Sequence, residues 1–155
     1  MNNQALVEVL AQNAQRLEAL FTGLSEAEAR RAPAPGEWSA LEVLTHVRTA
    51  EAIMMPRVLQ ILVRPGVRLP DMDEHRWAAL LARARLPVSE QVAAFAARRR
   101  ELIGLLATLR PDEWETAGEH ELQGKLTVRH IAEHAAGHER EHLEQLEAVR
   151  RSIGR

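Results

Sequence analysis

The residues best suited to chemistry are four histidines spaced four residues apart near the C-terminal end of the chain: His130, His134, His138 and His142. Two imidazoles one helical turn apart commonly bind a divalent metal such as zinc from one face of a helix. The residues between these histidines are mainly alanine and glutamate, and alanine and glutamate favour a helix. The spacing therefore predicts a metal site on a helix over residues 127–149.

The four histidines cannot all face the same direction. Successive helical residues turn by about 100°, so a four-residue repeat drifts by about 40° per step. The apolar stripe of this helix is centred on Ile131, and His138 and His142 fall within about 20° of that direction. His134 falls on the flank of the stripe, and His130 points toward solvent. Helical phase therefore selects His138 and His142 as the inward pair and gives His134 a position suited to contacting a substrate.

A third metal ligand has to come from another segment. His46 is the leading candidate, because it lies on the apolar face of a helix predicted over residues 39–63. His75 and His120 lie in loop or short-helix regions and are weaker candidates. Three neutral imidazoles leave at least one coordination position open for water or substrate, which is the arrangement of a catalytic metal.

These histidines also have ordinary structural explanations. His130 is best explained as a solvated surface residue, and for His134 that explanation is about as good as a functional one. His138 and His142 could be core histidines satisfied by hydrogen bonds, and so could His46 taken alone. The residue types thus favour a metal centre, with a bundle that contains only structural histidines as the alternative.

The elements that must position these histidines are helices. Apolar residues recur at helical spacing over four long segments: residues 4–23, 39–63, 90–109 and 127–149. Shorter helices are predicted after Ser25, over residues 71–85 and over residues 111–114, and loops are predicted over residues 64–70 and 115–126. Capping residues mark the helix starts: Ser25 with Glu28, Ser39 with Glu42, Ser89, and Thr127. Pro56 lies inside the second long helix and is expected to kink or break it.

The composition predicts one all-α domain. The 155-residue chain is 46% hydrophobic and 27% charged and contains no tyrosine. Four amphipathic helices of this length bury one another as a four-helix bundle, a fold that builds metal sites from residues on facing helices. We therefore expect residues 1–155 to form a single helical bundle domain, with the short extra helices in the crossover loops.

Charge and cysteine content argue against several classes of function. The net charge is −2 and the charges of both signs are interleaved, so the chain lacks the basic stripe of a nucleic-acid-binding protein. Without cysteine there is no disulfide, no thiol nucleophile and no thiolate-ligated metal. The N-terminus carries no basic region and no apolar run long enough for a membrane span. We expect a cytoplasmic protein that acts on a small molecule.

Other prominent side chains receive structural or undecided interpretations. Trp38 and Trp77 are interpreted as core or helix-packing anchors, and the run Arg98–Arg100 as a solvated helix face. A catalytic metal also needs a nearby general base. His134 is one candidate, and three glutamates that the sequence does not rank are the others: Glu51, Glu139 and Glu141.

Six short motifs follow one another along the chain: Trp38-Ser39, Leu44-Thr-His46, Asp71-Met-Asp-Glu-His-Arg-Trp77, Arg110-Pro-Asp-Glu-Trp114, Gly124-Lys-Leu-Thr127, and His138-Glu-Arg-Glu-His142-Leu-Glu-Gln145. Each is short, but their order and spacing together resemble the DinB-like (DinB/YfiT) superfamily of metalloenzymes over nearly the whole chain. The resemblance implies a four-helix bundle with up-down-down-up topology, often dimeric. It also implies a divalent metal, typically zinc or nickel, with His46, His138 and His142 as its ligands.

The resemblance further implies classes of reaction. Members of this superfamily include thiol-dependent S-transferases that use bacillithiol or mycothiol, and a mycothiol-dependent maleylpyruvate isomerase. The leading hypothesis is therefore a metal-dependent S-transferase or hydrolase, with His134 as a candidate catalytic residue and a homodimer as the expected assembly. Because the chain has no cysteine, any thiol has to be a small-molecule cosubstrate. The alternatives are a non-catalytic, stress-related metal-binding or dimerisation bundle and a plain helical interaction domain.

Overall fold

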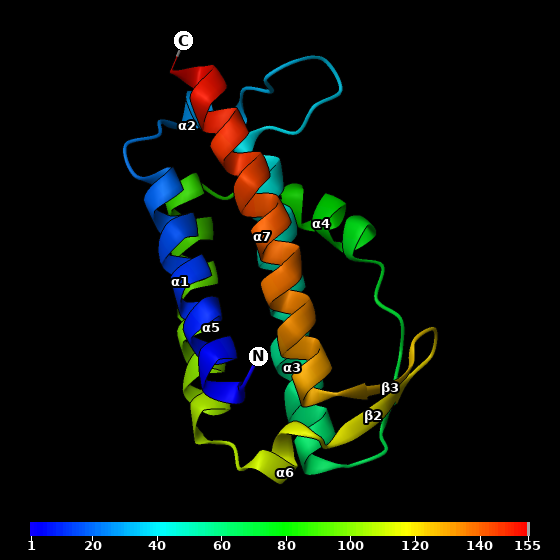
Figure 1. Ribbon diagram of the computed structural model, residues 1–155. Coiled ribbons are helices and arrows are strands. Elements are labelled where there is room, and N and C mark those ends of the chain that lie inside the picture. Colours follow the sequence, from blue (N-terminus) through cyan, green and yellow to red (C-terminus); the bar gives the residue numbers. More distant parts are fainter. Residues whose placement is uncertain (155) are drawn as a thin grey trace.

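Four long helices form a bundle in the computed structural model, which describes residues 1–154 (Figure 1). They are α1 (Asn3–Phe21), α3 (Ala40–Val63), α5 (Val88–Thr108) and α7 (Val128–Ile153). Helices α1 and α7 run in one direction and α3 and α5 in the other, so the predicted up-down-down-up topology is confirmed. None of the described helices is long and apolar enough to cross a membrane.

The packing order of the helices explains where the shorter elements lie. Helix α1 packs against α5 and α7, and α3 packs against the same two helices. Because α3 and α5 run parallel, the chain needs a long crossover between them, which contains β1 (Arg68–Leu69) and α4 (Glu74–Ala82). This crossover places α4 beside α3, outside the bundle and away from α1 and α5 (Figure 1).

The capping boxes predicted at Ser25 and Ser39 are present, and the predicted cap Thr127 also forms one. Each serine or threonine accepts a backbone N–H three residues later, at Ser25 for α2 (Glu26–Arg30), Ser39 for α3 and Thr127 for α7. The predicted cap at Ser89 is wrong. Helix α5 begins two residues earlier than predicted, after Pro87, whose carbonyl oxygen accepts the N–H of Gln91 at 3.1 Å without any side-chain cap.

A small three-stranded sheet occupies segments that were predicted to be loops. After α6 (Pro111–Trp114), β2 (Ala117–His120) and β3 (Gly124–Thr127) form an antiparallel hairpin, and β1 pairs in parallel with β2. The loop prediction for residues 115–126 is therefore wrong, as is part of that for residues 64–70. Strands this short do not show a clear alternation of apolar and polar residues, and their pairing depends on contacts distant in sequence.

Several predictions about individual residues change in the folded chain. The sequence predicts that Pro56 kinks or breaks its helix, but α3 continues through Pro56, which is exposed, so the helix is not broken there. Trp77 is 41% exposed and is not a core anchor, whereas Trp114 is 1% exposed and packs in the core. The interpretation of Arg98–Arg100 as a solvated face is wrong for Arg99, which is fully buried at the centre of the bundle.

Gly118 is required by close packing between the sheet and α3. A Cβ at this position would lie 2.9 Å from the carbonyl oxygen of Val67 and 3.2 Å from Cγ1 of Ile61. We expect Gly118→Ala to lower the free energy of unfolding by about 1–3 kcal/mol, as measured by urea denaturation. Gly104→Ala in α5 is the matched control, because a Cβ there meets nothing within 4 Å and should stabilise the helix. Equal effects of both substitutions would contradict this packing argument.

Candidate metal centre

The three histidines predicted as metal ligands lie together where α3 packs against α7. His46 is on the second turn of α3 and is 5% exposed. His138 and His142 occupy successive turns of α7 and are half-buried. Nε2 of His138 lies 2.8 Å from Nε2 of His46 and 3.1 Å from Nε2 of His142.

The donor set fits a divalent metal in both chemistry and charge state. One candidate ligand atom from each of the three histidines lies within 4.8 Å of the other two, which allows one ion to reach all three. Burial, together with the neighbouring His142 and His75, lowers the pKa of His46 to about 4. Burial and the same neighbours, with His46 and His134, lower the pKa of His138 to about 3. Both imidazoles are therefore neutral near pH 7, as metal ligation requires.

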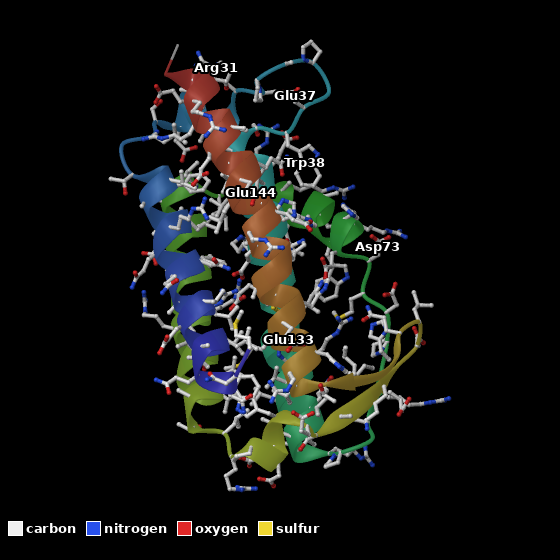
Figure 2. All side chains as sticks on the ribbon, viewed as in Figure 1. Arg31, Glu37, Trp38, Asp73, Glu133 and Glu144 are labelled. Atoms are coloured by element: carbon white, nitrogen blue, oxygen red, sulfur yellow. The ribbon has the colours of Figure 1, made fainter. Side chains whose placement is uncertain are left out.

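Side chains around the three histidines orient one of the rings. Nδ1 of His142 lies 3.0 Å from Oε1 of Gln145, which accepts a hydrogen bond from the Nδ1–H and leaves Nε2 free to face the other histidines. Figure 2 shows Trp38 close to α7, where its ring stacks on His142 at a centroid distance of 6.1 Å. The Nδ1 atoms of His46 and His138 are buried without a hydrogen-bond partner among residues 1–154.

We expect Gln145→Ala to weaken metal binding by about 10–100-fold, the usual effect of removing a group that orients a metal ligand. The expected loss follows from the hydrogen bond between Nδ1 of His142 and Oε1 of Gln145, which sets the tautomer of the His142 ring. Competition with a chromophoric chelator measures the change. Glu144→Ala, an exposed neighbour on α7, serves as the control. Equal affinities for wild type and Gln145→Ala would show that the hydrogen bond does not orient the ligand.

The remaining histidines of α7 lie where helical phase predicts. His134 is exposed, one turn before His138, and its ring lies 5.9 Å from that of His138 in a stacked orientation. His130 is also exposed and accepts the backbone N–H of Thr127 in the capping box that starts the helix. His134 therefore lies beside the three histidines, and His130 has a structural role at the helix end.

His75 is the site residue that sequence reasoning ranked too low. It comes from α4, and its ring stacks over that of His46 at a centroid distance of 5.2 Å. Its position depends on the α3–α5 crossover, so helical periodicity could not reveal it, although it lies within one of the motifs shared with the DinB-like superfamily. His120 is far less relevant to the site, because its Nδ1 accepts backbone N–H groups within the β2–β3 hairpin.

The glutamates named as candidate bases occupy different environments. Glu51 and Glu139 are buried and both pair with the guanidinium of Arg99, so neither carboxylate is free to take a proton from a substrate. Glu141 is exposed on α7. The imidazoles of His75 and His134 lie in ring contact with His46 and His138, respectively.

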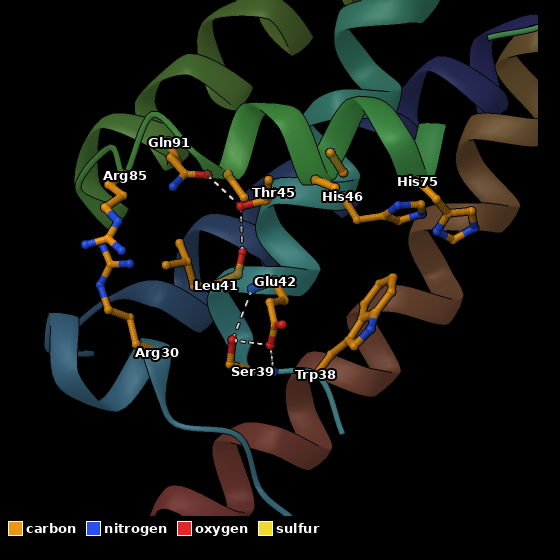
Figure 3. Close-up of a pocket in the computed structure, with 13 residues that line it drawn as sticks. Arg30, Trp38, Ser39, Leu41, Glu42, Thr45, His46, His75, Arg85 and Gln91 are labelled. Carbon is orange, nitrogen blue, oxygen red and sulfur yellow. Dashed lines mark hydrogen bonds between the residues drawn. The ribbon is translucent and has the colours of Figure 1, made fainter. Parts of the chain in front are cut away.

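A cavity of about 450 Å³ opens beside His46 (Figure 3). Its wall near the three histidines is formed by His46, His75 and Trp38, and its opposite end by Arg30 and Arg85. Between these ends, alanines of α4 and Leu41 provide an apolar surface. The arrangement provides room for a small organic molecule next to a candidate metal centre.

The chain is similar in sequence to two bacterial proteins. It is 26% identical over 157 residues to YuaE from Bacillus subtilis, covering 92% of this chain and 97% of YuaE. It is 21% identical over 128 residues to an Oceanobacillus iheyensis protein named "Putative metal-dependent hydrolase", covering 83% of this chain and 73% of that protein.

Solved structures share the fold. YfiT from Bacillus subtilis, described as a probable metal-dependent hydrolase with an unusual four-helix bundle topology, superposes with a TM-score of 0.86 at 16% identity, covering 98% of this chain and 87% of YfiT. The four-helix bundle protein TT2238 gives a TM-score of 0.66 at 22% identity, covering 95% of this chain and 99% of TT2238. The family model of the DinB superfamily matches residues 10–146. The motifs, the topology and this match together establish that the chain belongs to the DinB superfamily.

Proposed function

We propose that this protein is a metal-dependent enzyme acting on a small molecule, with His46, His138 and His142 as ligands of a zinc or nickel ion. The observation that carries the proposal is the convergence of three imidazole nitrogens, 2.8 Å and 3.1 Å apart, beside a cavity of about 450 Å³. Hydrolysis is the favoured reaction, because two relatives carry names or descriptions of metal-dependent hydrolases.

The proposed chemistry divides between the metal and the surrounding side chains. A divalent ion held by three neutral imidazoles supplies Lewis acidity, which polarises a substrate oxygen and lowers the pKa of a water or thiol. Gln145 holds the His142 ring in one tautomer, and Trp38 covers one side of that ring. His75 stacks on His46 and His134 stacks on His138, so each imidazole lies beside the proposed metal centre, where it could transfer a proton to or from a substrate. His134 remains our candidate catalytic residue from the sequence, and His75 is the added candidate.

Transfer to a thiol is the second candidate reaction. The chain has no cysteine, so the thiol would be a low-molecular-weight cosubstrate. The cavity beside His46 has the volume to hold a second small molecule, which supports this candidate. A homodimer is proposed on the resemblance to the superfamily alone.

Activity measurements on protein of defined metal content test the proposal. Metal-stripped protein is reloaded with zinc or nickel and assayed with activated esters and amides, and separately with a thiol and an electrophile such as monobromobimane. We expect activity only after reloading, and a rate at least about 100-fold lower in His134→Ala or His75→Ala if that residue transfers the proton. Hydrolysis without added thiol identifies a hydrolase, and consumption of electrophile only with thiol identifies a transferase.

A non-catalytic metal-binding bundle predicts a different set of results. In that case metal removal lowers the melting temperature, and no activity appears with either substrate panel after reloading. Metal bound without an exchangeable water position would also support this alternative, because a structural zinc site is closed by four protein ligands. Failure to bind any divalent metal would refute both the enzyme and the metal-binding bundle.

A further inference from the structure

Two arginines define the end of the 450 Å³ cavity that lies away from the three histidines. Arg30 reaches it from α2, and Arg85 reaches it from the segment that follows α4. Figure 3 shows their side chains pointing toward one another across this end, with His46 and His75 at the opposite end. Two like charges that face each other repel, so this arrangement favours an anion between them.

The acidic groups nearby leave this positive charge largely uncompensated. Arg85 has no carboxylate partner within residues 1–154, and Arg30 uses only Nε, which lies 3.2 Å from Oε2 of Glu26. The other oxygen of Glu26 accepts the backbone N–H of Val88, so Glu26 holds Arg30 in place. Among the described residues that line the cavity, Glu42 is the one carboxylate, and its Oε2 accepts the N–H and Oγ–H of Ser39, each at 2.8 Å.

The backbone of Arg85 provides an independent observation. Its φ angle is +49°, and it is the one non-glycine residue with positive φ in the described part of the chain. An L side chain is disfavoured in this conformation, which glycine adopts without steric cost. Non-glycine residues held there concentrate at functional sites, where the side chain is needed despite the strain. Here the side chain that the strained backbone presents is a cavity-lining guanidinium.

From these observations we infer that the cavity binds a small organic acid, with its carboxylate between Arg30 and Arg85. Guanidinium groups bind carboxylates through paired, charge-assisted hydrogen bonds. The apolar body of the acid lies along Ala78 and Ala79 of α4, and its other end lies near His46. The assignment of the reacting group to the end near His46 rests on the proposed function. The anion site between Arg30 and Arg85 does not depend on the proposed function.

Binding of a matched pair of probes tests the inference. Calorimetric titration of the full-length, metal-loaded protein compares 3-phenylpropionate with its neutral isostere 3-phenylpropionamide. We expect the acid to bind at least about tenfold more tightly, because a charge-assisted pair replaces a neutral contact. The double variant Arg30→Gln/Arg85→Gln should lose this preference without losing metal. The matched control is Arg31→Gln/Arg83→Gln, which removes two exposed arginines that do not line the cavity and should keep the preference.

Two further variants separate this inference from the proposed function and from simple structural roles. In His138→Ala, which removes a proposed metal ligand, a retained preference for the acid supports the anion site even if the metal proposal fails. A preference that disappears with the metal but survives in Arg30→Gln/Arg85→Gln would overturn the inference, because the carboxylate would then bind the metal. Arg85→Gly should leave the melting temperature equal or higher while reducing the preference. An unchanged preference in Arg85→Gly would overturn the role of Arg85 in binding the acid and leave it only a part of the turn that follows α4.

Discussion

Replacing His138 with alanine should reduce the bound metal from about one equivalent to less than about a tenth of that under conditions where wild type is saturated. Nε2 of His138 lies 2.8 Å from that of His46 and 3.1 Å from that of His142, so its removal leaves a site with only two of the three proposed ligands. Removing a group that only supports a ligand already costs about 10–100-fold in affinity, and loss of a ligand should cost more. Elemental analysis of purified wild-type and variant protein measures the stoichiometry directly.

The control for this experiment comes from the same helix. His130 is exposed and participates in the capping box at the start of α7, so His130→Gln preserves a capping side chain while removing an imidazole. We expect this variant to keep the full metal content. Equal metal content in His138→Ala and wild type would refute the ligand assignment. Metal loss in His130→Gln would place the metal at another site on α7.

Replacing Arg99 with methionine should lower the free energy of unfolding by about 3–5 kcal/mol, because removing one partner leaves buried charge without compensation. Arg99 is fully buried on α5 and pairs with Glu51 of α3 and Glu139 of α7. Its Nη1 also donates to the carbonyl oxygen of Leu10 on α1, at 3.3 Å. Asn13 of α1 donates to Glu139 at 3.2 Å. A single buried cluster therefore joins all four long helices.

The pH dependence of this variant distinguishes loss of charge compensation from loss of packing. Burial raises the pKa of Glu139 above its usual value, while the hydrogen bonds and charge of Arg99 oppose that rise. Without Arg99 the pKa rises further, so the folded variant binds protons more readily than its unfolded chain. Its stability then falls as pH increases through the raised pKa. The difference in stability from wild type should be smaller near pH 5 than near pH 8.

Urea denaturation at both pH values measures these differences, and Arg100→Met supplies the control. Arg100 is the next residue but is exposed, so its replacement should change the free energy of unfolding by less than about 0.5 kcal/mol. The triple variant Arg99→Met/Glu51→Gln/Glu139→Gln removes the uncompensated charge and should recover part of the lost stability. A similar loss in Arg99→Met and Arg100→Met, or the same loss at both pH values, would contradict the role assigned to this cluster.

Predictions from the sequence succeeded where a pattern is local to one helix. The helical phase of α7 depends only on a turn of about 100° per residue, and the phase correctly separates His138 and His142 from the exposed His130. The capping boxes at Ser25 and Ser39 form within four residues, and both are present. The four-helix bundle followed from four amphipathic segments, and its topology followed from the resemblance to the DinB-like superfamily.

Predictions failed where the outcome depends on residues that are distant in sequence. The β1–β2 pairing joins residues about 50 positions apart, and no local pattern marks it. Arg99 lies between two other arginines in the sequence, which suggests a solvated face. It is buried because Glu51 and Glu139, from two other helices, meet it in the core. The single-domain assignment for residues 1–155 and the metal-ligand roles of the three histidines remain predictions.

The sequence by itself determined the helices, their apolar faces and the inward direction of each candidate ligand, because these properties repeat with the period of the helix. The tertiary structure alone decided what meets those ligands. The crossover brings α4 back beside α3, so His75 stacks over His46, and the part of the crossover from His75 to Arg85 helps to form the cavity between His46 and Arg85. These contacts depend on the path of the crossover between the parallel helices α3 and α5. That path is set by the packing of all four long helices.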